Sequence, residues 1–241
     1  MNSDERELFA TSVEAAMTSG SVDVVLEELG WADALGEDPQ TAIAVLFELQ
    51  GRACATSVAL ERVLGDVAFE ARVVAGGIDP GARVVELVGD APAAAVRLAR
   101  LALSHELIGA SRAMLELART HALERIQFGV PIASFQAVRH RLAETLVAIE
   151  TAQAAVDAAW LDDASHHAAI AKAVAGRSAR TTAKHCQQVL AGIGFTMEHP
   201  FHRYFRRVLV LDEQFGSARV LTQELGEQIL ATGVLPTTVR L

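Results

Sequence analysis

Segment 124–144 constrains the fold of this chain more than any other, because it ends one helix and starts the next. Its sequence is ERIQFGVPIASFQAVRHRLAE. Apolar residues recur at helical spacing up to Ile126, and Gly129 and Pro131 cannot continue that helix. Ser134 is predicted to be the N-cap of the helix that follows. The segment therefore predicts a tight corner between two helices that pack side by side.

Helical periodicity extends to both sides of this corner and predicts a bundle of four antiparallel helices. Asp90 as an N-cap and Pro92 in the first turn mark the start of a long helix that runs to Ile126. Further helices are expected over residues 134–161, 165–190 and 200–231, with a break in the last near Gly216. Short connections and facing apolar stripes are typical of an up-down bundle, so the predicted fold class is all-α.

The residues before the bundle predict a small helical region and one short β-hairpin. Helices are expected over residues 4–18 and 22–29 and along the apolar pattern from Pro39 to Leu64, with Trp31 as a core anchor. Between Gly65 and Asp90 two β-branched runs flank a Gly-Gly-Ile-Asp-Pro-Gly turn, which is typical of a hairpin. The predicted domains are residues 1–68, a helical N-terminal region, 69–90, a hairpin or linker, and 91–241, the four-helix bundle.

Composition excludes several classes of function. The chain has 21 basic and 30 acidic side chains and a formal charge of −9, which repels nucleic acids and anionic membrane surfaces. Hydrophobic residues make up 51% of it and its mean hydropathy is +0.27, so we expect apolar surface that is buried against another subunit. The acidic N-terminus MNSDERELFA does not resemble a secretory signal, no apolar run is long enough to span a bilayer, and we expect a cytoplasmic protein. Cys54 and Cys186 are expected to be reduced core thiols.

Three side chains at the corner suggest a chemistry. Arg125 carries a guanidinium fork that matches phosphate, Phe128 carries a ring that stacks on planar groups, and Gln127 lies between them. A helix corner of this kind suits a ligand with a phosphate and a planar ring. An ordinary turn between helices explains the same residues, and the physics of the residues alone favours that interpretation while leaving the ligand site open.

The corner also resembles a known signature. The pattern ERxQFGxPIxxFQ is similar to that of the acyl-CoA dehydrogenases, flavoenzymes that desaturate acyl-CoA thioesters between the α and β carbons. Residues 187–207, QQVLAGIGFTMEHPFHRYFRR, resemble a second segment of that family, and the expected two helices separate the two matches. The resemblance covers residues 91 to about 230 well and residues 1–68 loosely, and it implies the same C-terminal four-helix bundle.

The resemblance implies a shared FAD site. In this family the corner and the second motif reach the ADP portion of an FAD that the neighbouring subunit mainly binds. Ala191 stands where the family usually has glycine, which places a methyl group where backbone approaches phosphate. Without the corner, the glycines of the second motif would be interpreted as an ordinary helix C-cap. The positions implied to bind the cofactor are Arg125, Gln127, Phe128, Gln188, Gly192 and Gly194.

The catalytic base is where the chain departs from the family. The family removes the α-proton with a glutamate, and the matching position holds Phe215. Some members draw the base from the first bundle helix, and the matching position there holds Ala99, followed by Arg100 as a candidate substrate contact. Asp212 and Glu213 lie nearby, but two or three residues along a helix rotate a carboxylate away from the required direction. We therefore expect no catalytic residue in this chain, with Glu213 as the remaining candidate.

Other polar residues suggest structural roles. His166 and His167 are adjacent and are expected to point to different helix faces, so no metal site is expected. Arg203, Arg206 and Arg207 form the strongest positive cluster, for which ion pairing and phosphate contact both stay open. Arg207 stands where the family pattern has aspartate, which puts the local ion-pair network in doubt.

A full family member has a β-domain between its helical parts, and residues 65–90 hold only a hairpin in its place. The resemblance therefore implies a subunit that helps to bind FAD for α,β-dehydrogenation in a heteromer with a full-length acyl-CoA dehydrogenase. Electrons would pass to an electron-transfer flavoprotein. Such enzymes resemble those that actinobacteria use on steroid-derived acyl-CoA. The alternatives are a self-sufficient homodimeric dehydrogenase that uses Glu213 and a cofactor-free helical scaffold.

Overall fold

The computed structural model describes residues 3–73 and 77–234, so part of the predicted hairpin turn lies outside the described residues. It confirms an all-α fold with small antiparallel strand pairs. Before the bundle lie α1 (Ser3–Ser19), α2 (Val22–Glu28), α3 (Trp31–Glu37), α4 (Pro39–Ala53), α5 (Ala59–Leu64), β1 (Phe69–Val73) and β2 (Arg83–Leu87). The bundle region contains α6 (Ala93–Glu124), β3 (Ile126–Gln127), β4 (Val130–Pro131), η1 (Ile132–Ser134), α7 (Gln136–Trp160), α8 (Ser165–Leu190), η2 (Ala191–Phe195), α9 (Phe201–Glu213) and α10 (Ala218–Thr232).

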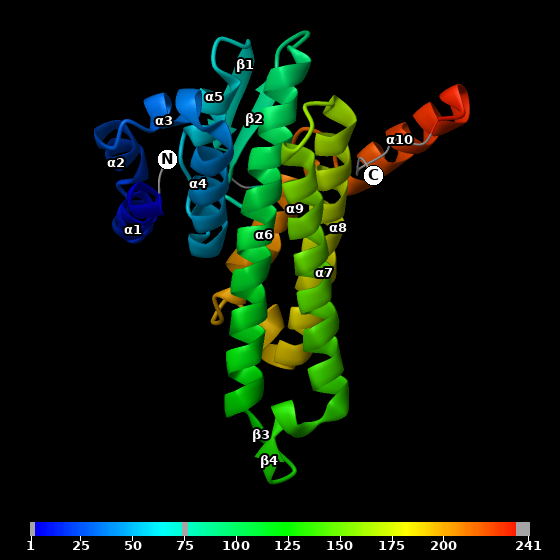
Figure 1. Ribbon diagram of the computed structural model, residues 1–241. Helices are drawn as coiled ribbons and strands as arrows, with labels where there is room; N and C mark the ends of the chain where they lie inside the picture. The colour runs from blue at the N-terminus through cyan, green and yellow to red at the C-terminus, as the bar shows by residue number, and fades with distance from the viewer. Residues whose placement is uncertain (1–2, 74–76, 235–241) are drawn as a thin grey trace.

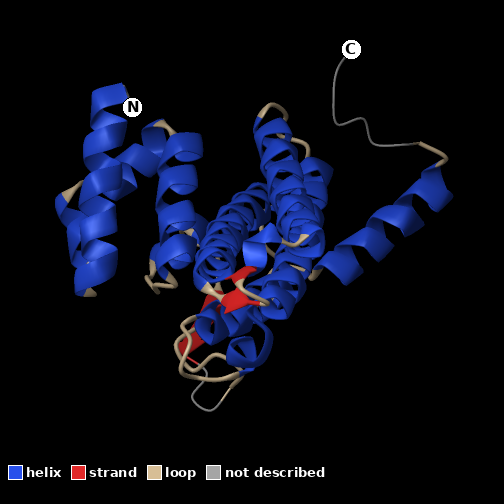
Figure 2. Cartoon of the chain, turned by 90° about the horizontal axis from the view of Figure 1, so that it is seen from below, coloured by secondary structure: helices blue, strands red, loops and turns tan. Residues whose placement is uncertain are grey.

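Three long antiparallel helices, α6, α7 and α8, form the body of the bundle (Figure 1). Their contact surfaces are rich in fully buried alanines, for example Ala110, Ala152 and Ala171, which let the helices approach closely. The predicted break near Gly216 divides the fourth helix in two. The first piece, α9, packs against α6 and α8, whereas α10 contacts α8 and then extends away from the bundle (Figures 1 and 2).

The N-terminal helices pack on the bundle through α4, which lies along α6 (Figure 1). Two glycines let the backbones of these helices meet. A Cβ on Gly51 would lie 2.1 Å from the carbonyl oxygen of Glu106, and one on Gly109 would lie 2.1 Å from that of Glu48. Trp31 is fully buried and donates a hydrogen bond to the carbonyl oxygen of Ala42 (3.3 Å), which confirms it as a core anchor.

Several predicted boundaries are wrong. The helical pattern from Pro39 to Leu64 is broken, because Cys54 takes a left-handed conformation (φ 50°) and ends α4. The residues from Trp31 form a short helix that the sequence analysis did not predict. Ser134 does not cap α7, since it lies in the 3₁₀ turn that precedes it and the flanking position belongs to Phe135. Pro92, and not Asp90, flanks the start of α6.

The predicted hairpin is present between α5 and α6. Strands β1 and β2 pair antiparallel with Phe69 opposite Leu87 and Val73 opposite Arg83. The hairpin is tied to the bundle by Gln214, whose Oε1 accepts a hydrogen bond from the backbone N–H of Val85 (2.9 Å). Both cysteines are buried free thiols. No helix in the described part of the chain is long and apolar enough to cross a membrane.

Candidate functional site

The corner forms a very short hairpin at the far end of α6 and α7 (Figure 1). Phe128 (φ 54°) and Gly129 (φ 81°) both have positive φ, as a tight two-residue hairpin turn requires. The backbone N–H of Arg125 bonds to the carbonyl oxygen of His121, and the carbonyl oxygen of Arg125 accepts from Ile132 (both 2.8 Å). The backbone is therefore fixed, and the side chains are directed outward.

Those side chains make few contacts with the rest of the chain. Phe128 is 93% exposed, and its ring meets that of Phe135 edge to face, with centroids 6.1 Å apart. The Arg125 guanidinium has no hydrogen bond or ion pair with any described residue, and Gln127 bonds only to the carbonyl oxygen of Ile126 (2.7 Å). The corner thus offers a free cation, an amide and an open aromatic face.

The second motif forms the end of α8 and η2. Gln188 is exposed, and Ala191 holds a backbone conformation (φ 53°, ψ −134°) that normally belongs to glycine. Gly192 faces open space, so a ligand could approach its backbone. Gly194 is buried, and a Cβ there would lie 2.9 Å from the Cβ of Leu190. The two glycines therefore have different reasons to be glycine, access for Gly192 and packing for Gly194.

Both motifs lie toward the same end of the bundle, the lower end in Figure 1. Burial lowers the pKa of His199, in the loop after η2, and the charges of His121, in the last turn of α6, and of His202 lower it further. Large apolar side chains are exposed on these segments, which is unusual for surface without a partner. They include Leu123, Ile126, Phe128, Val130, Phe195 and Met197.

Neither of the two positions where the resemblance places the base holds a carboxylate. Ala99 is fully buried, and the adjacent Arg100 donates from Nε to the carbonyl oxygen of Phe215 (3.0 Å). Phe215 (φ 55°) and Gly216 (φ 100°) form a turn with consecutive positive φ values. The Arg100 side chain therefore binds the backbone of this turn.

A buried lysine also binds the backbone of this turn. Lys172 is fully buried and donates from Nζ to the carbonyl oxygens of Asp212 (2.9 Å) and Gly216 (3.3 Å), and burial lowers its pKa to about 8. The Asp212 carboxylate accepts from the backbone N–H of Ala218 (3.0 Å) and from Nε of Arg180 (2.5 Å). These bonds commit Asp212 to shaping the turn, so it is not free to act as a base.

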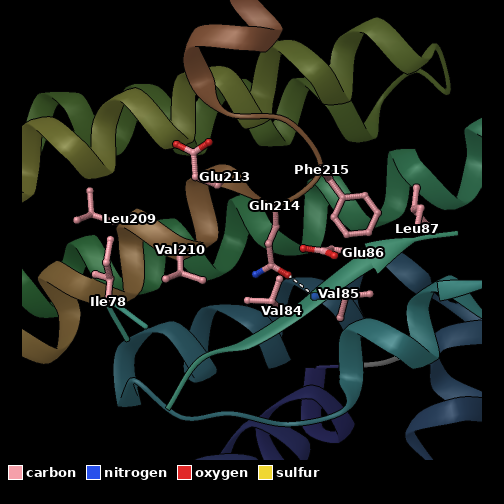
Figure 3. Close-up of a pocket in the computed structure, with 10 residues that line it drawn as sticks. All are labelled: Ile78, Val84, Val85, Glu86, Leu87, Leu209, Val210, Glu213, Gln214 and Phe215. Carbon is pink, nitrogen blue, oxygen red and sulfur yellow. Dashed lines mark hydrogen bonds between the residues drawn. The ribbon is translucent and has the colours of Figure 1, made fainter. Parts of the chain in front are cut away.

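A cavity of about 430 Å³ opens between β2 and α9, beside this turn (Figure 3). Phe215 forms part of its wall. Glu213 points away from β2 and pairs with Nη2 of Arg180 (2.9 Å), whereas Gln214 points toward β2 (Figure 3). Glu86 is paired with Arg72 (2.9 Å). The cavity suits an apolar group and presents no unpaired carboxylate. Its apolar lining consists of Ile78, Val84, Val85, Leu87, Leu209, Val210 and Phe215.

A polar cluster that the sequence analysis missed joins α9 to the N-terminal region. Arg207 is 4% exposed and donates to the Asp79 carboxylate (2.6 Å), the carbonyl oxygen of Ala55 (2.5 Å) and Oγ1 of Thr56 (3.1 Å). Its guanidinium also lies 3.6 Å from Oε1 of Glu106. Burial raises the pKa of Glu106 to about 7, against the opposing effect of Arg207. The only sequence signal was arginine at a position where the family pattern has aspartate.

Two predictions about polar side chains differ from the structure. Arg203 is exposed and Arg207 is buried, so the three arginines do not form one surface patch. His166 and His167 were expected to point to different faces, yet their rings touch edge to face with centroids 4.2 Å apart, although only His167 is buried. Within residues 3–73 and 77–234, no group of three or more His, Cys, Asp or Glu is placed to hold a metal ion.

Comparisons with known proteins agree with these motifs. The family model "Acyl-CoA dehydrogenase, C-terminal domain" matches residues 91–230. The acyl-CoA dehydrogenase IpdE2 of Mycobacterium tuberculosis is 39% identical over 123 residues, which cover 51% of this chain and 37% of that relative. The chain thus spans well under two thirds of that relative's length.

Two solved structures are similar over nearly the whole chain. The steroid ACAD Tcur3481–Tcur3483 contains a chain with a TM-score of 0.71 and 21% identity, covering 95% of this chain and 96% of that one. The ChsE4–ChsE5 complex from Mycobacterium tuberculosis contains one with a TM-score of 0.70 and 19% identity, covering 97% of both. At these identities the similarity establishes the fold alone.

Proposed function

This chain belongs to the acyl-CoA dehydrogenase family, and from that premise we propose that it is a non-catalytic subunit that completes the FAD site of a full-length partner. The partner supplies the glutamate base, the β-domain that covers the flavin, and the thioester pocket. This chain supplies contacts to the ADP end of the cofactor. The heteromer acts in the cytoplasm and passes electrons to an electron-transfer flavoprotein.

One contrast carries this proposal. The Arg125 guanidinium has no hydrogen bond or ion pair in the described part of the chain, and Phe128 is 93% exposed, so the binding groups of the corner are available. The base positions hold Ala99 and Phe215, and neither side chain can accept a proton. A subunit with available cofactor contacts and no base fits a role in binding better than a role in proton abstraction.

The residues fit the ADP portion of FAD chemically. Arg125 suits the diphosphate because a guanidinium donates two parallel hydrogen bonds to phosphate oxygens. Phe128 offers a face for a planar ring, Gln127 and Gln188 offer amide groups, and Gly192 has room for a close approach. When bound, FAD supplies the hydride acceptor for the dehydrogenation. The residues of this chain bind and orient the nucleotide end, at a distance from the reacting carbons.

The need for a partner is supported by the apolar side chains exposed on the same end of the bundle, among them Phe195 and Met197. The two similar structures are named as complexes of two different proteins, one of them a steroid ACAD. We therefore extend the proposal to a heteromer that acts on a steroid-derived acyl-CoA. We also propose residues 1–68, 69–90 and 91–241 as the organisation of the chain.

The proposal is tested by flavin content in the complex purified from the native host. Replacing Arg125 and Gln127 by alanine is expected to lower the FAD occupancy of the complex and leave its assembly intact. Arg119→Ala is the matched control, because Arg119 is an exposed arginine near the end of α6 whose ion pair among the described residues is with Glu116. The proposal fails if the double variant keeps full flavin occupancy and full assembly, a result that would favour the cofactor-free scaffold.

The homodimeric alternative has its own test. It requires the chain purified without any partner to bind FAD and to dehydrogenate an acyl-CoA with Glu213 as base. Because Glu213 is exposed and paired with Arg180, we expect Glu213→Gln to leave the turnover of the complex unchanged. A loss of tenfold or more would instead support this residue as an unusual base.

A further inference from the structure

A second cleft, of about 500 Å³, lies where α1 and α4 meet α6 and α7. No residue of the corner, of the second motif or of the turn at Phe215 and Gly216 lines this cleft. Its walls combine apolar side chains such as Val45 and Leu49 with polar groups from all four helices. Two of these polar side chains have a buried atom without a hydrogen-bond partner among the described residues, His105 Nδ1 and Gln153 Oε1.

The hydrogen bonds of His105 fix what this side chain offers. It is 2% exposed, and Nε2 accepts the indole N–H of Trp160 (3.2 Å). A ring nitrogen that accepts a hydrogen bond leaves the proton of the neutral imidazole on the other nitrogen. Burial lowers the pKa of His105 to about 4, so the ring is neutral near neutral pH. His105 therefore presents an unused N–H donor at Nδ1.

Gln153 supplies the complementary group. Its Nε2 donates to the carboxylate of Asp157 (2.8 Å), which identifies the remaining amide atom, Oε1, as an acceptor. Asp157 and Trp160 follow Gln153 at helical spacing on α7, and all three line the cleft. Buried polar atoms in proteins are rarely left unpaired, so an unused donor and an unused acceptor in one cleft need an explanation.

The charges around the cleft favour a neutral ligand. Two cations line it, Arg6 and Arg112, and two carboxylates, Glu48 and Asp157, so the formal charges cancel. Arg112 is already paired with Glu48 (2.6 Å). An ion entering the cleft would lose hydration and find no net opposite charge. A neutral polar molecule has no such cost.

We propose that this cleft binds a small, neutral, planar amide, with its carbonyl oxygen bonded to His105 Nδ1, its N–H bonded to Gln153 Oε1, and its ring against Trp160. A carboxamide or lactam carries the required acceptor and donor next to each other. Such a ligand would contact the N-terminal helices and the bundle at once. The site is separate from the proposed cofactor contacts, so either proposal can fail without the other.

Benzamide is a suitable probe, titrated by calorimetry into the complex, with the partner alone as a blank. For a probe of this size, ligand efficiency predicts a Kd of about 10 mM or tighter. His105→Phe and Gln153→Met remove the donor and the acceptor, and each is expected to weaken binding about 2- to 10-fold. Methyl benzoate has no N–H, so the wild type should bind it about 2- to 10-fold more weakly than benzamide. Its affinities for the wild type and for Gln153→Met should be equal.

Gln223→Met is the matched control, because Gln223 is an exposed glutamine on α10 that bonds only to Glu227, and its affinity for benzamide should equal that of the wild type. If His105→Phe does not fold, Gln153→Met decides, since Gln153 is only partly buried. The proposal is overturned if benzamide shows no saturable binding, or if it binds Gln153→Met as tightly as the wild type. The first result would mean that the cleft takes no such ligand, and the second that Gln153 does not supply the acceptor.

Discussion

Replacing Arg207 by methionine is expected to destabilise the fold strongly, and more at high pH than at low pH. The substitution keeps most of the volume and removes the cation that lies among Asp79, Glu106 and the carbonyl oxygen of Ala55. Removing one partner of a buried ion pair costs about 3–5 kcal/mol, because the remaining charge stays buried without compensation.

The pH dependence follows from Glu106. Its pKa is raised from 4.5 to about 7 in the folded chain, so the folded state holds the proton more tightly than the unfolded state. Glu106 contributes fully to the free energy of unfolding below its unfolded pKa. This contribution, on the order of 3 kcal/mol, is lost as the pH rises through its folded pKa. Without Arg207 the folded pKa rises further, so the loss continues above neutral pH.

We therefore expect Arg207→Met to cost about 2–3 kcal/mol near pH 6, where Glu106 is mostly protonated, and about 4–5 kcal/mol near pH 8. The assay is urea unfolding followed by circular dichroism at both pH values. Arg203→Met is the matched control, since this arginine lies one turn earlier on α9 and is exposed, and it should change stability by less than about 0.5 kcal/mol. A cost for Arg207→Met below about 1 kcal/mol at both pH values would refute the reasoning.

Two further substitutions test backbone features. Gly51→Ala should cost more than about 3 kcal/mol in urea unfolding, because its Cβ would lie 2.1 Å from a backbone carbonyl oxygen of α6. The control is Gly226→Ala, whose Cβ would meet nothing within 4 Å, and it should stabilise the fold by about 0.5–1 kcal/mol. Equal effects of the two substitutions would contradict the close contact at Gly51. Ala191→Gly should stabilise by about 1 kcal/mol, because glycine relieves the strain of a positive φ. The exposed Ala143→Gly in α7 should instead destabilise by a similar amount, and a loss of stability in both would argue against strain at Ala191.

The sequence predicts well the elements whose signals are local. Residues Ser165 to Leu190 form a helix with the predicted bounds, and the break near Gly216 and the hairpin of residues 69–87 are also confirmed. The end of α4 at Cys54 was missed because apolar periodicity continues through it and no glycine marks the left-handed residue. Ser134 has the right chemistry for a cap, but the 3₁₀ turn before α7 moves the helix start to Gln136.

In the candidate site, too, local motifs were predicted and contacts between distant residues were missed. The corner was predicted because Arg125 and Phe128 belong to one continuous motif. The hydrogen bond from Arg100 to the carbonyl oxygen of Phe215 was not predicted, since 115 residues separate the two. Nothing in the sequence indicated that Arg207 would bind Ala55, 152 residues away, or that His105 and Gln153 would share a cleft. Such contacts depend on how helices from both ends of the chain pack, and no local pattern encodes that.

The backbone contact between α4 and α6 limits how the N-terminal helices can move. Each helix places a carbonyl oxygen where a side chain of the other would begin, at Gly51 and at Gly109. Sliding by a single residue would bring a Cβ into that space, so small adjustments of register are blocked sterically. The N-terminal helices, α1 to α5, can then only stay packed on the bundle or detach from it together. They should behave as an all-or-none unit, so partial proteolysis or hydrogen exchange should find them either fully protected or fully open.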